Sequence, residues 1–504
     1  MKVAFLMATI GCLPASLLAQ SAAVTRAAAT ITEADVRRRI QIVADDSMGG
    51  RDTPSRGLDL TAQWVAAEFK RFGLKPAGSS ADYVLPYKIT TRRVDPARSS
   101  VTFTGPSATI ALEVGKGAAI AVHGGSGEFP VVLLGGGIDS ATTAQLKGKA
   151  VVWVADWSKG FPSNANQILQ AAFVGGAKLM VAVINNPGAF DQLAGQPQGD
   201  QTVVGDGPRE GLSVFFTNEA AVVAQVPDAA AQLAQLRAAT TPIVVPAPDW
   251  MAKSAVHDTI LTTSLAPNVA AVVEGTDPAL KNEYIVVSAH MDHVGSECKG
   301  SGPKDSICNG ADDDGSGTVG IVELAEAFAQ AGARPKRSIL FLGVSGEEKG
   351  LWGSAQFAKN PPVPIGSIVA DLNIDMIGRN WKDTVVAIGM QHSDLGATLA
   401  KVAGEHPDLT MAAIDDRWPE ENLYFRSDHY NFALKGVPIL FFTSGLHDDY
   451  HAVSDTPDKI DAEKEARILQ LIFHLATTIA NTPDRPKWNP ASYEKIVDKP
   501  NQVP

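Results

Sequence analysis

Cysteine and positive charge are both scarce in this chain. Only three of its 504 residues are cysteine, and Cys12 lies in the N-terminal apolar stretch, so the mature chain holds at most one disulfide. Forty-three Lys and Arg residues face 55 Asp and Glu residues, which gives a net charge of −12. No basic tract offsets this balance, and we therefore expect no nucleic-acid partner. The oligomeric state is left open by the sequence.

Outside the N-terminal segment, the sequence contains no long apolar run. No stretch there approaches the roughly 20 apolar residues of a membrane-spanning helix. The run at residues 3–18 follows Lys2, is interrupted by Pro14 and precedes alanines at 19 and 22. This pattern predicts a cleaved secretory signal at residues 1–22. We expect an exported protein, in the periplasm or the medium, with no stable membrane insertion after cleavage. A lipoprotein signal ending at Cys12 is the weaker alternative, because the apolar run continues past it.

Several common catalytic motifs are also missing. The sequence contains no HExxH helix, no GxSxG elbow, no Walker A loop and no dinucleotide fingerprint after a strand. These absences exclude the zincin, serine hydrolase, nucleotide-binding and Rossmann interpretations. With 504 residues, 45% of them hydrophobic, the chain can form two to four domains with substantial cores.

The stretch 284–350 joins apolar runs to metal-binding and acid–base residue types. Residues 284–288 lead to His290, and residues 338–344 lead to a pair of glutamates. An aspartate triplet at 312–314 stands before a glycine-rich turn and a helical apolar pattern. Short β-rich runs alternating with helices indicate a mainly parallel α/β sheet. Ligands gather beyond the carboxyl ends of such strands, so we expect these residues to converge in one crevice.

Two later strand-like runs, 368–374 and 437–443, supply further candidate ligands. The predicted metal ligands are His290, Asp313, Glu348, Asp375 and His451. Two imidazoles and three carboxylates suit zinc, with cobalt or manganese as alternatives. Three carboxylates against two divalent ions leave one positive charge, which a bridging hydroxide would neutralise. Charge counting therefore favours two metal ions.

These residues also have plainer interpretations. A calcium loop with Gly315 as its sixth residue would place Ile321 at the twelfth position, where a carboxylate is needed, so that interpretation fails. A Glu–Glu pair after a strand is usually surface charge. Here the pair belongs to one of five sequence segments that carry candidate ligands in order along the chain, so we interpret it as part of the site. The other histidines are assigned no role and are expected on the surface or in the core: His293, His392, His406, His429 and His447.

Cys298 and Cys308 remain once the signal is removed. An even pair of cysteines in an oxidising compartment predicts a disulfide, which would close a small loop between His290 and Asp313. Two free thiols are the alternative.

Five motifs, in order, resemble metallopeptidase family 28, the dinuclear zinc aminopeptidases. They are AHMDHVG at 289–295, GADDDGSG at 310–317, SGEEKGLWGS at 345–354, NIDMIG at 373–378 and DDYHAVSDTPDKI at 448–460. GKAVVWVADW at 148–157 and the segment 175–186 resemble a protease-associated domain, in a region poor in metal ligands. The resemblance implies a zinc-exopeptidase-like mixed sheet, mainly parallel with helices on both faces, and an inserted β-rich module. The expected divisions are a signal at 1–22, an N-terminal peptidase part at 23–104, the inserted domain at 105–250, the catalytic domain at 251–485 and a tail without assigned structure at 486–504.

The resemblance implies removal of N-terminal residues from peptide substrates with two Zn²⁺. One ion would be held by His290 and Asp375, and the other by Glu348 and His451. Asp313, joined to Asp314 by a cis peptide, would bridge both ions.

The remaining roles also follow from the resemblance. Glu347 would be the general base, moving a proton from the metal-bound water to the leaving amine. Tyr450 and Arg426 would stabilise the oxyanion. Asp292 and Asp455 would orient His290 and His451, and Asp314 would support Asp313.

Three alternatives share this scaffold. A carboxypeptidase of this type normally carries a helical dimerisation domain after the catalytic histidine, and only residues 452–504 follow His451. A glutaminyl cyclase usually keeps one zinc, which the full ligand set argues against. A non-catalytic binding relative would have lost Glu347 or a ligand, and none is lost.

Overall fold

The computed structural model describes residues 15–78, 81–122, 124–196, 199–207, 209–330 and 332–497. The chain divides into two compact units. The main unit lies within Met1–Tyr87 and Leu265–Lys499, and the inserted unit is Lys88–Ser264. The inserted unit is wider than the predicted module at 105–250, because residues 100–104 of one strand pair with residues 251–255 of another.

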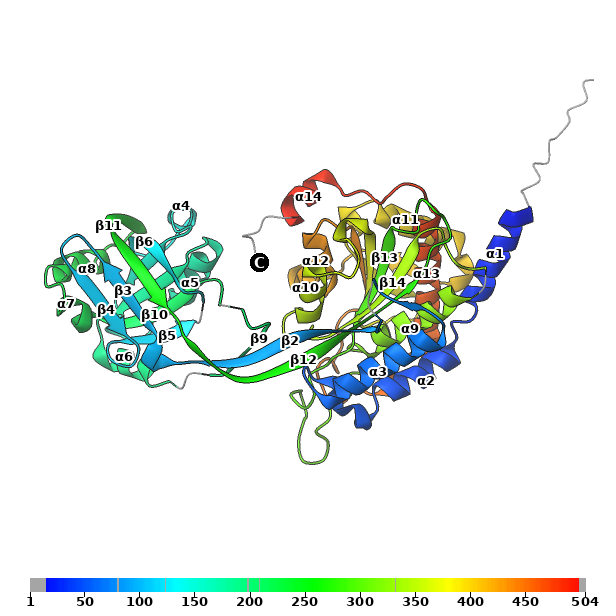
Figure 1. Cartoon of the computed structure of the whole chain (residues 1–504), viewed down its shortest axis with the longest axis horizontal. Helices are drawn as coiled ribbons and strands as arrows, with labels where there is room; N and C mark the ends of the chain where they lie inside the picture. Colours follow the sequence, from blue (N-terminus) through cyan, green and yellow to red (C-terminus); the bar gives the residue numbers. More distant parts are fainter. Residues whose placement is uncertain are drawn as a thin grey trace, which may run out of the picture. The chain divides into compact units, whose positions relative to one another are not determined.

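The main unit is built on a mixed, mainly parallel sheet, as predicted for the fold class (Figure 1). Its strands run in the order β17-β16-β18-β15-β13-β14-β12. The four central strands β18, β15, β13 and β14 are parallel, whereas β12 is antiparallel to β14 and β16 to β18. The bounds are β12 Asp258–Val273, β13 Tyr284–His290, β14 Ser338–Val344, β15 Ile368–Ile374, β16 Thr384–Ile388, β17 Ala412–Ile414 and β18 Ile439–Thr443, with β1 Lys75–Pro76 paired to β12.

Helices cover both faces of this sheet (Figure 1). Along β13, Ile285 and Val287 belong to one buried cluster and Val286 belongs to another. A strand that is buried on both faces reads as a continuous apolar run, which explains the sequence signal. The first cluster packs under α1 Ala15–Ala28, α2 Glu33–Val43, α3 Arg56–Arg71, α9 Gly315–Ala329, α11 Leu395–Glu405 and α13 Ala462–Asn481, and the second under α10 Trp352–Lys359 and α12 His429–Leu434.

The inserted unit has its own sheet, with strand order β4-β3-β11-β6-β7-β8-β10-β5. Strands β6, β7, β8 and β10 are parallel, and five helices accompany them. The bounds are β3 Ser100–Thr104, β4 Thr109–Glu113, β5 Ala118–Val122, β6 Gly127–Gly135, α4 Ser140–Thr143, β7 Ala150–Val154, α5 Ala165–Val174, β8 Leu179–Ile184, α6 Pro187–Ala194, β10 Ser213–Asn218, α7 Glu219–Val223, α8 Ala229–Arg237 and β11 Ile243–Ala255. Strands β2 Val84–Val94 and β9 Gln201–Val204 pair with each other outside this sheet.

The two ends of the chain can be compared with the predicted signal and the predicted tail. Residues 1–14 of the predicted signal lie outside the described residues, and α1 runs through the predicted cleavage positions 19 and 22. Among the described helices, none is both long and apolar enough to cross a membrane. The tail, for which we predict no structure, contains α14 Pro490–Ile496. Asn489 caps this helix, and the indole of Trp488 donates to the carbonyl of Gly436.

Candidate metal centre

Parallel strands deliver the predicted ligands to one edge of the main sheet. His290 is the last residue of β13, whereas Asp375 directly follows β15 and the glutamate pair lies three and four residues after β14. The strand register places His290 opposite Val344 and Ser288 opposite Asn373, so the carboxyl ends of the three strands coincide. The ligands are therefore neighbours, although they lie far apart in the sequence.

The aspartate triplet is held in place by buried hydrogen bonds at the start of α9. Asp314 Oδ1 accepts from the backbone N–H groups of Gly317 at 2.9 Å and Met376 at 3.2 Å, and its Oδ2 accepts from that of His290 at 3.2 Å. One carboxylate thus connects the helix to the ends of two strands. The peptide bond between Asp313 and Asp314 is cis, as the family resemblance implies.

Asp313 faces an imidazole with each of its carboxylate oxygens. Its Oδ1 lies 3.5 Å from His290 Nε2, which is also 3.5 Å from Asp375 Oδ1. Its Oδ2 lies 3.1 Å from His451 Nε2, which is 3.0 Å from Glu348 Oε2. The five predicted ligands therefore form two groups that share Asp313.

The spacing of these atoms is compatible with bound metal ions. Zinc lies about 2.0–2.2 Å from nitrogen and oxygen ligands, so tetrahedral ligand atoms are about 3.3 Å apart. The four distances around Asp313, between 3.0 and 3.5 Å, match this value. Within the described part of the chain, Asp313 Oδ2 and His451 Nε2 are buried without a hydrogen-bond partner. Such unpartnered atoms are costly unless a ligand satisfies them.

The electrostatics of the site also call for cations. Burial raises the pKa of Asp313, with a further contribution from the charge of Glu348. Burial also raises the pKa of Glu347 well above its usual value, and the nearby Asp428 and Asp375 add to the effect. Burial alone would lower the pKa of His451, but its contacts with Asp313 and Glu348 raise it to about 10. Divalent ions would relieve this concentration of buried negative charge.

A small cavity of about 50 Å³ opens beside one of the two groups. Its charged lining comes from His290, Asp313, Asp375, Glu347 and Arg426. Its remaining wall is mostly apolar and includes Met376, Leu423, Phe441 and Leu446. Glu347 thus faces the cavity next to the ligands, while its backbone N–H donates to Asp292 Oδ1 at 3.3 Å.

Tyr450 and Arg426 both line this cavity but differ in their surroundings. The Tyr450 ring stacks on His451 with centroids 4.0 Å apart, and burial raises the pKa of its hydroxyl. His451 has a φ of +50°, a backbone conformation that non-glycine residues adopt mainly at functional sites. The exposed Arg426 guanidinium lies 3.3 Å from the carboxylate of Glu421.

Two aspartates were predicted to orient the histidine ligands. Asp292 lies beside His290, whose Nδ1 is 3.1 Å from the Asp292 carbonyl and 3.7 Å from its carboxylate. Asp455 takes a different position from the predicted one. Its Oδ2 accepts from the backbone N–H groups of Asp312 at 3.0 Å and Asp313 at 3.2 Å. Asp455 therefore holds the bridging loop, rather than His451.

Sequence reasoning missed three residues that shape the site. His293 was expected on the surface or in the core, but its Nδ1 lies 2.9 Å from Glu348 Oε1 and 3.6 Å from Asp313 Oδ2. Its place three residues after His290 was the available signal. Arg51 is fully buried and donates to the carbonyls of Met291 and Gly310, both at 2.8 Å. Ser427 donates to Asp375 Oδ2 at 2.8 Å.

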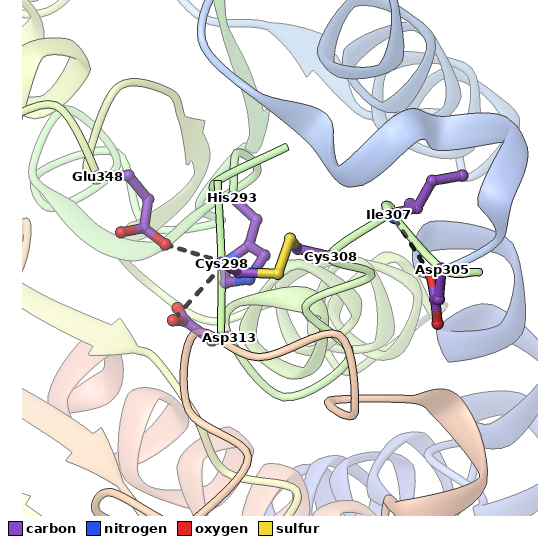
Figure 2. Close-up of a disulfide and its surroundings, with 7 residues drawn as sticks. All are labelled: His293, Cys298, Asp305, Ile307, Cys308, Asp313 and Glu348. Carbon is purple, nitrogen blue, oxygen red and sulfur yellow. Dashed lines mark hydrogen bonds and ion pairs between the residues drawn. A yellow bond between two sulfur atoms is a disulfide. The ribbon is translucent and has the colours of Figure 1, made fainter. Parts of the chain in front are cut away.

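The predicted disulfide between Cys298 and Cys308 is present (Figure 2). Lys299, next to Cys298, donates its N–H to the carbonyl of His451 at 2.8 Å and accepts from the N–H of Val453 at 3.0 Å. Cys308 donates its N–H to the carbonyl of Gly295 at 2.8 Å. The disulfide loop thus connects the backbone after His290 to the backbone of His451 and Val453.

Comparison with known proteins identifies the part of the chain that carries this site. Residues 268–476 match the model of Peptidase family M28. The main unit carries a peptidase family M28 domain. This match confirms the resemblance to metallopeptidase family 28, whereas the protease-associated character of the inserted unit stays a prediction.

Relatives of the M28 domain include a "Probable leucine aminopeptidase" of Arthroderma otae. It is 30% identical over 222 residues, which cover 42% of this chain and 58% of that protein. A "Probable zinc metalloprotease" of Pyricularia oryzae is 37% identical over 265 residues, covering 43% of this chain and 50% of that protein. The matched part of the chain thus spans little more than half the length of these relatives. Among solved structures, an aminopeptidase from Aneurinibacillus sp. strain AM-1 is 18% identical, with a TM-score of 0.48 over 93% of this chain and 98% of that chain.

The disulfide loop leads to a prediction about metal retention. Replacing both cysteines by Cys298→Ser and Cys308→Ser should speed the loss of metal from the group containing His451, because Lys299 loses the covalent anchor beside it. Zinc content during dialysis against a chelator measures the effect. Lys304→Ala, an exposed change in the same loop, should leave the rate unchanged. Equal rates for the wild type and the double variant, or free thiols in the unreduced protein, would contradict this prediction.

Proposed function

We propose that this protein is a zinc aminopeptidase that removes N-terminal residues from peptides. The observation that carries the proposal is the shared Asp313, with one imidazole on each carboxylate oxygen, beside a cavity that also exposes Glu347. A non-catalytic relative would have no need for an acid–base group at this position.

The residues present would hold two zinc ions. His290 and Asp375 would hold one, Glu348 and His451 the other, and Asp313 would contact both. When bound, the ions supply Lewis acidity, which polarises the scissile carbonyl and lowers the pKa of a water molecule. Glu347, which faces the cavity, would take a proton from the attacking water and return it to the leaving amine. Tyr450, which lines the same cavity, would stabilise the developing oxyanion.

The charge around the cavity favours an aminopeptidase over a carboxypeptidase. Of the three carboxylates that line it, Asp313 and Asp375 are assigned to metal, which leaves Glu347 to face the ammonium group of a peptide N-terminus. Arg426, the one arginine or lysine among the lining residues, already pairs with Glu421.

Hydrolysis of amino-acid anilides tests this proposal. The zinc-loaded protein should hydrolyse anilides with a free α-amine, lose activity on chelation and regain it when zinc is restored. The same anilides with an acetylated α-amine are the control and should resist cleavage, because the acidic lining then meets no cation. Cleavage of both series at similar rates, or release of C-terminal residues from peptides, would contradict the aminopeptidase assignment.

Adjacent glutamates should separate catalysis from metal binding. Glu347→Ala should lower kcat by about 10²–10⁴ while both ions stay bound, because Glu347 moves protons and holds no metal. Glu348→Ala should lower metal content first, with activity following. Zinc stoichiometry and kcat measured on both variants decide the roles. A Glu347→Ala protein that loses metal, or keeps near-wild-type turnover, would refute the assignment.

We also propose that the protein is exported after cleavage of residues 1–22. Ala27 and Ala28 follow the predicted cleavage positions and are buried, so the mature chain would retain these contacts. N-terminal sequencing of the protein from the periplasm or medium should begin between residues 20 and 23. A chain recovered only inside the cell, with residues 1–22 intact, would contradict export.

A further inference from the structure

We propose that His293 is a sixth protein ligand of the metal centre and binds the ion held by Glu348 and His451. That ion is then enclosed by four side chains, whereas the ion at His290 and Asp375 keeps an open position for substrate. The inference rests on the proposed metal-dependent function and deepens it, because it assigns different tasks to the two ions.

The position of the His293 ring fits a ligand. The side chain is fully buried, and Figure 2 shows it directed toward Glu348 and Asp313. Its Nδ1 lies 2.9 Å from Glu348 Oε1 and 3.6 Å from Asp313 Oδ2. These distances bracket the separation of about 3.3 Å expected between ligands of a tetrahedral zinc ion. Ligand atoms of His293, Asp313, Glu348 and His451 all lie within 4.8 Å of one another.

The His293 ring makes its polar contacts with residues of this group. Among the described residues, its Nε2 is buried and has no hydrogen-bond partner. Close packing against Gly310 fixes the ring, since a Cβ at Gly310 would lie 2.6 Å from two of its carbon atoms. The polar contacts found for the ring are both with residues of the metal centre.

The cavity supplies an independent reason to treat the two groups differently. It is lined by His290, Asp313 and Asp375, but not by His293, Glu348 or His451. Structural zinc sites have four protein ligands, whereas catalytic sites have three and leave one position open. The three-ligand group therefore faces the substrate cavity, and the four-ligand group lies away from it. The open ion would contact the substrate, and the enclosed ion would hold Asp313 and its charge in place.

Two substitutions at His293 distinguish a ligand from a hydrogen-bond donor. His293→Asn keeps a donor near the position of Nδ1 but is a poor zinc ligand, and His293→Ala removes both properties. If His293 is a ligand, both variants should bind the first ion normally. Both should bind the second more weakly by more than the roughly 10–100-fold that loss of a ligand's hydrogen-bonding partner costs, as measured by zinc titration against a competing chelator. In the Co²⁺-loaded protein, the intense visible absorption of the four-coordinate ion should fall in both variants.

His429→Asn is the matched control, because His429 is also fully buried but lies in neither group and contacts the carbonyl of Tyr424. This variant should bind two ions as the wild type does. Wild-type affinity for the second ion in His293→Asn would overturn the inference and leave His293 as a hydrogen-bond donor to Glu348. If the wild type and both His293 variants all bind two ions tightly, only this inference is overturned. A wild-type protein that binds one ion or none overturns it together with the dinuclear centre.

Discussion

The position of Asp313 is the constraint on which the metal centre depends. Its two carboxylate oxygens must point toward two different imidazoles, and the backbone around it is held from several directions. Asp455 accepts from the N–H groups of Asp312 and Asp313, and Asp314 accepts from those of His290, Gly317 and Met376. Arg51 reaches the same loop from the N-terminal part of the chain through the carbonyl of Gly310. Because these partners come from distant segments, the main unit must fold as a whole before the two groups exist.

Buried negative charge is the energetic counterpart of this geometry. Asp313, Asp314 and Glu347 all have raised pKa values, and burial is the main cause in each case. A site of this kind is unfavourable without cations, because a buried charge is costly unless it is paired. The same charge favours divalent metal, and metal binding would relieve it.

The loop that contains the disulfide connects two parts of the metal centre. It leaves the strand that carries His290, forms the Cys298–Cys308 bridge and pairs through Lys299 with the backbone of His451. The backbones that carry His290 and His451, two predicted ligands of different groups, are thus connected through this loop as well as through the sheet. His293 lies between β13 and this loop, and its ring packs against Gly310.

Periodicity and motif order were enough to predict the sheet and the five candidate ligands. The run 284–290 is a continuous apolar strand because both of its faces are covered, and parallel strands bring their carboxyl ends together. The structure places the five ligands in two groups for this reason. Their neighbours could not be predicted in the same way, because a hydrogen-bond partner depends on the path of distant loops. Asp455 was expected at His451 but holds the Asp312–Asp313 backbone.

His293 shows the difference most clearly. In the sequence it is one more histidine after a strand, and no periodicity distinguishes a ligand from a buried residue. In the structure, the chain turns after His290 so that the ring of His293 meets Glu348, which lies 55 residues further along. The sequence by itself determined which residue types reach the edge of the sheet, through strand length and register. Only the tertiary structure decided which of them face the cavity and which lie away from it, because that depends on how the loops pack.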